Sequence, residues 1–184
     1  MTTTLTEKRK FTYEDYLKTP EDKRYELIEG ELIMTPSPII YHQRISKKIY
    51  YELEKFIREK RIGEIFYAPC DVHLDNGNVF QPDILFVSKN RLNIIGEKNI
   101  QGAPDLIIEI LSEATAYMDF GKKKRLYARF GVKEYWIADP QEKVIEIYSL
   151  KDNMFILINT FSEKDILKSS FLGIEIKLSD IFAF

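Results

Sequence analysis

The chain has 184 residues, enough for a single domain (residues 1–184) with a sizeable hydrophobic core. Its 45% hydrophobic and 30% charged residues are ordinary for a soluble globular protein. The net charge of −2 excludes a basic field over the whole molecule, although a local basic face could still bind DNA. With one cysteine, Cys70, an internal disulfide is excluded. Residues 1–10 lack a signal-peptide core, so we expect a cytoplasmic protein without a membrane anchor.

An acidic hairpin is predicted near the start of the chain, after a short helix opened by a capping box at residues 12–15. Apolar residues on both sides of Glu29 and Gly30 predict two strands joined by a tight turn. Alternation along the strands places Glu29 and Glu31 on one face and Glu26 on the other. Such a cluster usually consists of solvent-exposed carboxylates on an edge strand, and we expect two of the three glutamates to be of this kind.

A long helix is predicted between residues 36–38, whose two prolines interrupt the chain, and Lys60. His42 stands three residues before the apolar stripe of this helix. A histidine in this position is more often a packed or capping residue than a catalyst. The stripe is formed by Ile45, Ile49, Leu53 and Phe56.

Three apolar runs, at residues 82–87, 105–111 and 135–138, have the length and composition of strands that are buried on both faces. A further strand is predicted at residues 66–74, before a turn. Residues 93–102 are predicted to form a polar surface loop, with a lid or substrate-facing flap as a second interpretation.

Two of these buried strands each carry one carboxylate. Alternation places Asp83 on the face of Leu85 and Val87, and Glu109 on the face of Ile107 and Leu111. A carboxylate in such a run is costly unless it is paired or binds a cation. Two of them on consecutive strands therefore indicate a site. The alternative is structural, with Asp83 capping a turn and Glu109 in a buried salt bridge with Lys123.

A helix is predicted at residues 119–130, with Asp119 as its N-cap and Gly131 as its C-terminal cap. Its apolar stripe continues back to Lys123, which makes Lys123 the one basic residue of the helix that points inward. Four others are expected outside, where they could contact a phosphate backbone: Lys122, Lys124, Arg125 and Arg129.

The pattern as a whole predicts an α/β (α+β) fold with a central mixed β-sheet flanked by helices. The helix at 119–130 would connect two parallel strands. The last third adds strands at 144–149, 155–159 and 174–177. The apolar residues at the C-terminus could bury in a homodimer: Ile181, Phe182 and Phe184.

The order Pro82-Asp83, Glu109 and an inward lysine resembles the PD-(D/E)XK nuclease superfamily. More closely, residues 104–112, 126–129 and 131–140 resemble a large bacterial family catalogued as putative restriction endonucleases. The resemblance extends to residues 25–32 and 170–173 and so covers most of the chain. One position differs, because Leu111 stands where the superfamily pattern has its lysine.

The resemblance implies a restriction-endonuclease-like core and a Mg²⁺-dependent (or Mn²⁺-dependent) endodeoxyribonuclease that hydrolyses DNA. Asp83 and Glu109 would be the metal ligands, with the backbone carbonyl of Ile110, and their carboxyl groups should lie within about 4–5 Å. Lys123 would be the migrated catalytic lysine. Glu31 would be an auxiliary ligand and His42 would lie at the edge of the site.

Two other functions remain open at this stage. A nuclease fold without activity could serve as a DNA- or protein-binding module. A metal-dependent hydrolase could act on a substrate other than DNA. Cleavage assays with magnesium or manganese separate the first alternative from a nuclease.

Overall fold

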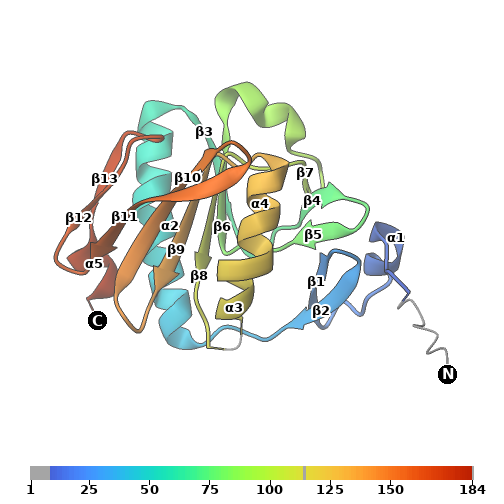
Figure 1. The fold of residues 1–184 in the computed structure, drawn as a ribbon. Coiled ribbons are helices and arrows are strands. Elements are labelled where there is room, and N and C mark those ends of the chain that lie inside the picture. The colour runs from blue at the N-terminus through green and yellow to red at the C-terminus, as the bar shows by residue number, and fades with distance from the viewer. Residues whose placement is uncertain (1–8, 114, 184) are drawn as a thin grey trace.

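A six-stranded mixed sheet forms the centre of the molecule (Figure 1) in the computed structural model, which describes residues 9–113 and 115–183. The strand order is β11-β10-β9-β8-β6-β3, and β8 and β9 are the parallel pair. The predicted mixed sheet is therefore confirmed. Its strands are β3 (Gly63–Tyr67), β6 (Ile84–Ser88), β8 (Leu106–Ile110), β9 (Glu134–Asp139), β10 (Val144–Lys151) and β11 (Met154–Ser162).

The crossover from β8 to β9 is helical and lies on one face of this sheet. It consists of α3 (Ala116–Met118), one π-helical stretch, η2 (Asp119–Lys123), and α4 (Lys124–Phe130). The expected glycine cap is confirmed, because Gly131 has φ +90° and ends α4. The expected N-cap is wrong: Asp119 has helical φ and ψ of −66° and −40° and lies inside the crossover, because α3 already begins at Ala116.

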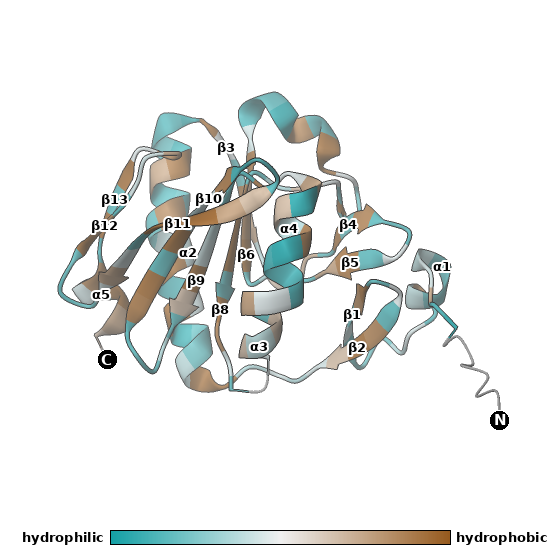
Figure 2. Cartoon of the chain, viewed as in Figure 1, coloured by the Kyte–Doolittle hydropathy of each residue, from teal (hydrophilic) through white to brown (hydrophobic). Residues whose placement is uncertain are grey.

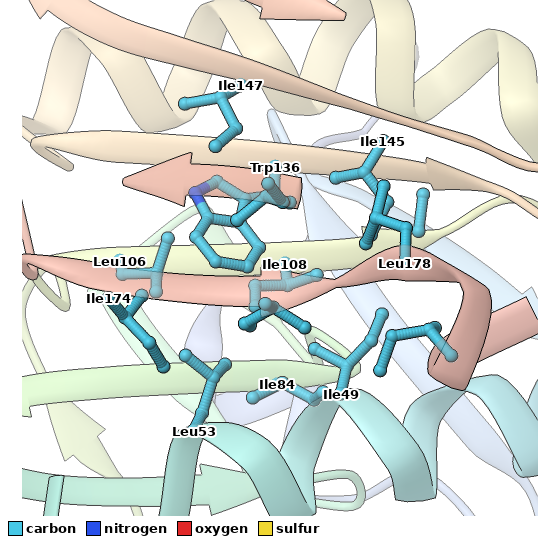
Figure 3. Close-up of a cluster of buried hydrophobic side chains, with 14 of the residues drawn as sticks. Ile49, Leu53, Ile84, Leu106, Ile108, Trp136, Ile145, Ile147, Ile174 and Leu178 are labelled. Carbon is cyan, nitrogen blue, oxygen red and sulfur yellow. The ribbon is translucent and has the colours of Figure 1, made fainter. Parts of the chain in front are cut away.

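The opposite face of the sheet is covered by the long helix α2 (Ile40–Lys60) and the C-terminal segment. Figure 3 shows this core, in which Trp136 of β9 lies among aliphatic side chains of the sheet and of α2. The C-terminal segment is the hairpin of β12 (Ile166–Ser169) and β13 (Ile174–Lys177) with the short helix α5 (Leu178–Phe182).

Two of the residues expected at a dimer contact belong to this core instead. Ile181 and Phe182 are 1% and 2% exposed and pack inside their own chain. The expectation that they are available to a second copy is therefore wrong, because burying them completes the cover of the sheet. Phe184, the third residue of that expectation, lies outside the described residues.

A second, smaller sheet packs against the crossover side of the molecule, with strand order β2-β1-β5-β4-β7. The predicted hairpin is confirmed in it, since Glu29 and Gly30 both have positive φ and join β1 to β2. The short helix α1 (Tyr13–Tyr16) begins with the predicted capping box of Thr12 and Asp15. The strands are β1 (Arg24–Ile28), β2 (Glu31–Thr35), β4 (Val72–Asp75), β5 (Asn78–Phe80) and β7 (Ile100–Gln101).

The predicted strand at 66–74 is wrong, because β3 and β4 are separate strands in different sheets. Pro69 stands between them and has no N–H to donate to a ladder, so the chain turns there. Residues 93–102 include the end of the 3₁₀ helix η1 (Lys89–Ile94) and strand β7, and they do not border the cavity described below.

The two faces of the sheet are occupied as strand alternation predicts. Ile84 and Phe86 of β6 belong to the core beneath α2, whereas Leu85 and Val87 belong to the core beneath α4. Figure 2 shows apolar residues concentrated on the central strands. In the described part of the chain, no helix is both long and apolar enough to cross a membrane.

Candidate active site

A cavity of about 450 Å³ opens where β8 ends, β6 begins and the first turn of α2 approaches the crossover. We call it the acidic cavity, because five acidic side chains line it: Glu26, Asp83, Glu109, Glu113 and Asp119. Among the described residues that line it, Arg24 and Lys123 are the two with a permanent positive charge. The cavity lies at the carboxyl ends of the parallel strands β8 and β9, where α/β sheets commonly bind ligands.

Asp83 is the residue directly before β6, and it lines this cavity. In the ladder Ile84 pairs with Ile108, so one further step brings Asp83 opposite Glu109. The Oδ2 atom of Asp83 accepts a hydrogen bond of 2.8 Å from the N–H of Ile110. The same atom lies 3.1 Å from Nε2 of His42. Asp83 is thus fixed to the end of β8 and to the start of α2.

Glu109 is buried on β8, on the face beneath the crossover, with 4% of its surface exposed. Its Oε1 accepts hydrogen bonds from the Tyr127 hydroxyl at 2.7 Å and from Lys123 Nζ at 3.1 Å. Burial raises the pKa of Glu109 well above its ordinary value, and Lys123 opposes this shift. The nearby carboxylates, Asp83 among them, raise the pKa further.

Lys123 points inward from η2, as the helical stripe predicts, and it is 6% exposed. Its Nζ lies 3.0 Å from Glu26 Oε1, 3.1 Å from Glu109 Oε1 and 3.5 Å from Asp119 Oδ1. Burial alone would lower the pKa of Lys123, but these three carboxylates outweigh burial and raise the pKa well above its ordinary value. Lys123 is therefore a charged group at the centre of an acidic cluster.

The sequence did not single out Glu26 as a site residue, yet it is the hairpin carboxylate that reaches the cavity. It is 3% exposed on β1 and accepts a hydrogen bond of 2.9 Å from the N–H of Gln81. The structure does not bring Glu31 there: its side chain is 54% exposed and pairs with Lys122 at 3.2 Å. Strand alternation could have identified Glu26, because it shares its strand face with Ile28, which belongs to the core beneath α4.

Asp119 is the second site residue whose role the sequence did not predict. It is 2% exposed, and its Oδ1 lies near Lys123 without accepting a hydrogen bond from any described residue. Burial raises the pKa of Asp119 to about 7, with Lys123 opposing and Glu26 and Asp83 adding to the shift. The π-helical stretch places Asp119 and Lys123 on the same inner side, and such stretches are frequent at functional sites.

His42 lies in the first turn of α2 and is brought to the cavity, where it contacts Asp83. Burial by itself lowers the pKa of His42, but the hydrogen bond and charge of Asp83 and the backbone of Ile110 give a net rise. Its Nδ1 is buried and makes no hydrogen bond within the described part of the chain. The histidine therefore serves as a polar partner of Asp83 rather than as an ordinary core residue.

The carboxylate oxygens that line the cavity suit a hard divalent cation that retains most of its coordinated water molecules. The described residues contain no group of three or more His, Cys, Asp and Glu side chains placed to hold a metal ion. Mg²⁺, however, is commonly held by one or two carboxylates together with waters and substrate phosphates. The hydrogen bonds of Asp83 and Glu109 fall on one oxygen of each carboxylate, Oδ2 and Oε1. Oδ1 and Oε2 can therefore serve as ligands.

Comparisons with known proteins agree with this fold. Residues 13–179 match the model of the Uma2 family, which is described as "Putative restriction endonuclease". The crystal structure of a putative nuclease belonging to DUF820 from Anabaena variabilis superposes with a TM-score of 0.79 at 22% sequence identity, over 94% of this chain and 98% of that chain. No curated protein matches the chain. Because the family model spans nearly the whole chain, the protein belongs to the Uma2 family and has its restriction-endonuclease-like fold.

Proposed function

We propose that the protein is a metal-dependent nuclease that hydrolyses phosphodiester bonds in DNA. The observation that carries this proposal is the meeting of three side chains in the acidic cavity. Asp83 and Glu109, from neighbouring strands, both line it, and Lys123 contacts Glu109 at 3.1 Å. Two carboxylates and a lysine are the set that a metal-assisted phosphodiesterase needs.

Charge balance supports the binding of Mg²⁺ or Mn²⁺ by Asp83 and Glu109, together with the carbonyl of Ile110. Five acidic side chains line the cavity, against Arg24 and Lys123 among the described residues. A bound divalent cation would stabilise the charged form of these carboxylates, against the burial that raises the pKa values of Glu109 and Asp119. When bound, such a cation supplies Lewis acidity, which lowers the pKa of water and stabilises the charge on a phosphate.

The residues of this chain would hold that arrangement in place. Tyr127 donates to Glu109 Oε1 and so leaves Oε2 for a cation, and His42 does the same for Asp83 through Oδ2. Of the three contacts of Lys123, the one to Asp119 is the longest and is not a hydrogen bond. Lys123 can therefore turn one N–H towards a water or a phosphate oxygen, where it would stabilise charge that develops in the transition state.

A second candidate function rests on the same ion cluster. The three carboxylates around Lys123 form a buried network that could be structural, in a nuclease fold that binds DNA or protein without cleaving it. In that case Asp83 and Glu109 would hold no cation. The two candidates differ in whether a divalent ion changes the behaviour of the protein.

Single-turnover cleavage with labelled DNA tests the proposal. Wild-type protein in Mg²⁺ or Mn²⁺ should cut, and Asp83→Asn and Glu109→Gln should each abolish the cut while the circular dichroism spectrum is unchanged. Glu113→Gln is the matched control, because Glu113 lines the cavity but is exposed and bonds Gln141. Cleavage that survives both Asp83→Asn and Glu109→Gln would contradict the proposal.

A further inference from the structure

One wall of the acidic cavity is largely apolar. It is formed by Pro36, Pro38 and Ile39, in the segment that joins β2 to α2, and by Tyr41, in the first turn of α2, and Pro140 also lines the cavity. Both prolines have a fixed φ, and the Tyr41 hydroxyl donates to the carbonyl of Pro140 at 3.3 Å. Ile39 is 70% exposed although it is a large aliphatic residue at the mouth of the cavity. A preformed apolar wall beside a few polar groups is the usual form of a site for a flat organic group.

The crossover carries two exposed aromatic side chains that are close in sequence to residues of the cavity. Tyr117 is 74% exposed and Phe120 is 46% exposed. They neighbour Thr115 and Asp119 in the chain, both of which line the cavity. Surfaces on which unpaired bases stack commonly carry exposed aromatic rings.

The charges around the cavity do not suit a continuous double helix. Duplex DNA carries a phosphate charge about every 1.7 Å along its axis, so duplex binders present a track of free basic side chains. Here Lys122 is paired with Glu31 at 3.2 Å and Arg125 with Glu29 at 2.9 Å. Two of the four basic residues predicted on the outer side of the crossover are thus paired with hairpin carboxylates, and Arg24 and Lys123 are the described basic residues that line the cavity.

We propose that the acidic cavity accepts an unpaired nucleotide, with its base against the wall of Pro36, Pro38, Ile39 and Tyr41 and its phosphodiester at Asp83 and Glu109. The preferred substrate is then single-stranded or locally unpaired DNA, not a continuous duplex. This inference rests on the proposed nuclease function and names the substrate of the same site. A nucleotide inside a duplex could reach the wall only after leaving the base stack, which costs energy.

Binding and cleavage are measured separately with one labelled sequence in three forms: single strand, blunt duplex, and duplex with a central bulge of unpaired nucleotides. Fluorescence anisotropy with the Glu109→Gln variant in Mg²⁺ reports binding without hydrolysis, because this variant should not cleave while Asp83 remains to hold the cation. Single strand and bulge should bind roughly 5- to 150-fold tighter than the duplex, the range expected for one stacked base. In Mg²⁺ or Mn²⁺ the wild-type protein should cut the bulged duplex at the bulge.

Two neighbouring isoleucines give a matched pair of variants. Ile39 lines the cavity, whereas Ile40 does not, and they are 70% and 71% exposed. Ile39→Ala should weaken the affinity for single-stranded DNA by about 4-fold for each methylene-sized group of Ile39 that the base covers. Ile40→Ala should leave this affinity unchanged. Ile39→Trp should strengthen it, because a ring gives the base a larger platform. Both positions are exposed, so none of these variants should unfold the protein.

The outcomes separate the two proposals. The inference would be overturned if duplex DNA were bound and cut as well as single-stranded DNA. It would also be overturned if Ile39→Ala and Ile40→Ala had equal effects on binding. In both cases the nuclease proposal would stand. Tighter binding of unpaired DNA without any cleavage would support the inference and contradict the nuclease proposal.

Discussion

Lys123 and Glu109 stand 14 residues apart in the chain, and their side chains meet in the acidic cavity with 3.1 Å between Nζ and Oε1. Leu111, the strand position where the nuclease pattern has its lysine, is instead a buried residue of the core beneath α4. The crossover therefore supplies from η2 the positive charge that β8 lacks. Two further carboxylates also contact Lys123. This one side chain therefore stabilises the buried acidic cluster and also has a role in the proposed reaction.

Lys123→Met should destabilise the protein by about 3–5 kcal/mol at neutral pH, because it leaves buried carboxylates without their cation. The loss should shrink as the pH falls, since burial already raises the pKa values of Glu109 and Asp119 and both then become neutral. Urea unfolding at pH 7.5 and pH 5 measures both effects. Lys122→Met is the control, because Lys122 is exposed and should cost less than about 0.5 kcal/mol. Equal losses at both positions would show that Lys123 does not hold the cluster.

Asp105 gives a prediction outside the cavity. It is fully buried; burial alone would raise the pKa of its carboxyl, but Lys133 at 2.7 Å, Ser88 and Arg91 hold it at about 2. A depressed folded pKa stabilises the protein above the ordinary value of 3.8, and this stability is lost as the pH falls through about 2. Asp105→Asn should therefore cost about 2 kcal/mol at pH 7 and much less near pH 2.

Chemical denaturation across that pH range checks the Asp105 prediction, with Asp152→Asn as the control. Asp152 is exposed in the β10–β11 turn at φ +50°, a conformation that asparagine also adopts well. A loss at Asp105 that is the same at pH 2 and pH 7 would contradict the role assigned to its charge.

His42 should tune the cation site through Asp83. His42→Ala should weaken Mg²⁺ binding by about 10- to 100-fold, the usual effect of removing a hydrogen-bond partner of a metal ligand. Isothermal titration calorimetry measures this affinity. His73→Ala is the control, because His73 stacks on Tyr13 at 4.1 Å and does not line the cavity. Unchanged affinity in His42→Ala, or an equal loss in His73→Ala, would remove His42 from the site.

Much of the site could be predicted because its key residues obey simple periodicities. Strand alternation predicted that Glu109 lies on the face beneath the crossover, and the helical stripe predicted that Lys123 points inward. Glu26 was not predicted as a site residue. Alternation assigns the hairpin side chains to two faces, but it does not show which face lies against a cavity formed by distant parts of the chain. Asp119 was assigned to a cap because local sequence does not reveal the π-helical stretch that draws it inward.

Magnesium should stabilise the folded protein by mass action. At a concentration 100 times the dissociation constant, the gain is about 2.7 kcal/mol, which raises the melting temperature by roughly 5–11 °C for a chain of this size. Asp83→Asn should remove the shift, while Asp71→Asn should keep it, because Asp71 bonds Tyr16 and Gln81 and does not line the cavity. A shift that persists in Asp83→Asn would place the ion elsewhere.

The most direct test of the account is the position of the ion itself. Crystals soaked in Mn²⁺ and measured at the manganese absorption edge give an anomalous difference map that locates it independently of any assay. The account predicts one peak in the acidic cavity, within bonding distance of a carboxylate oxygen from both Asp83 and Glu109. A fully soaked crystal with no peak there, or with the peak on other residues, would contradict it.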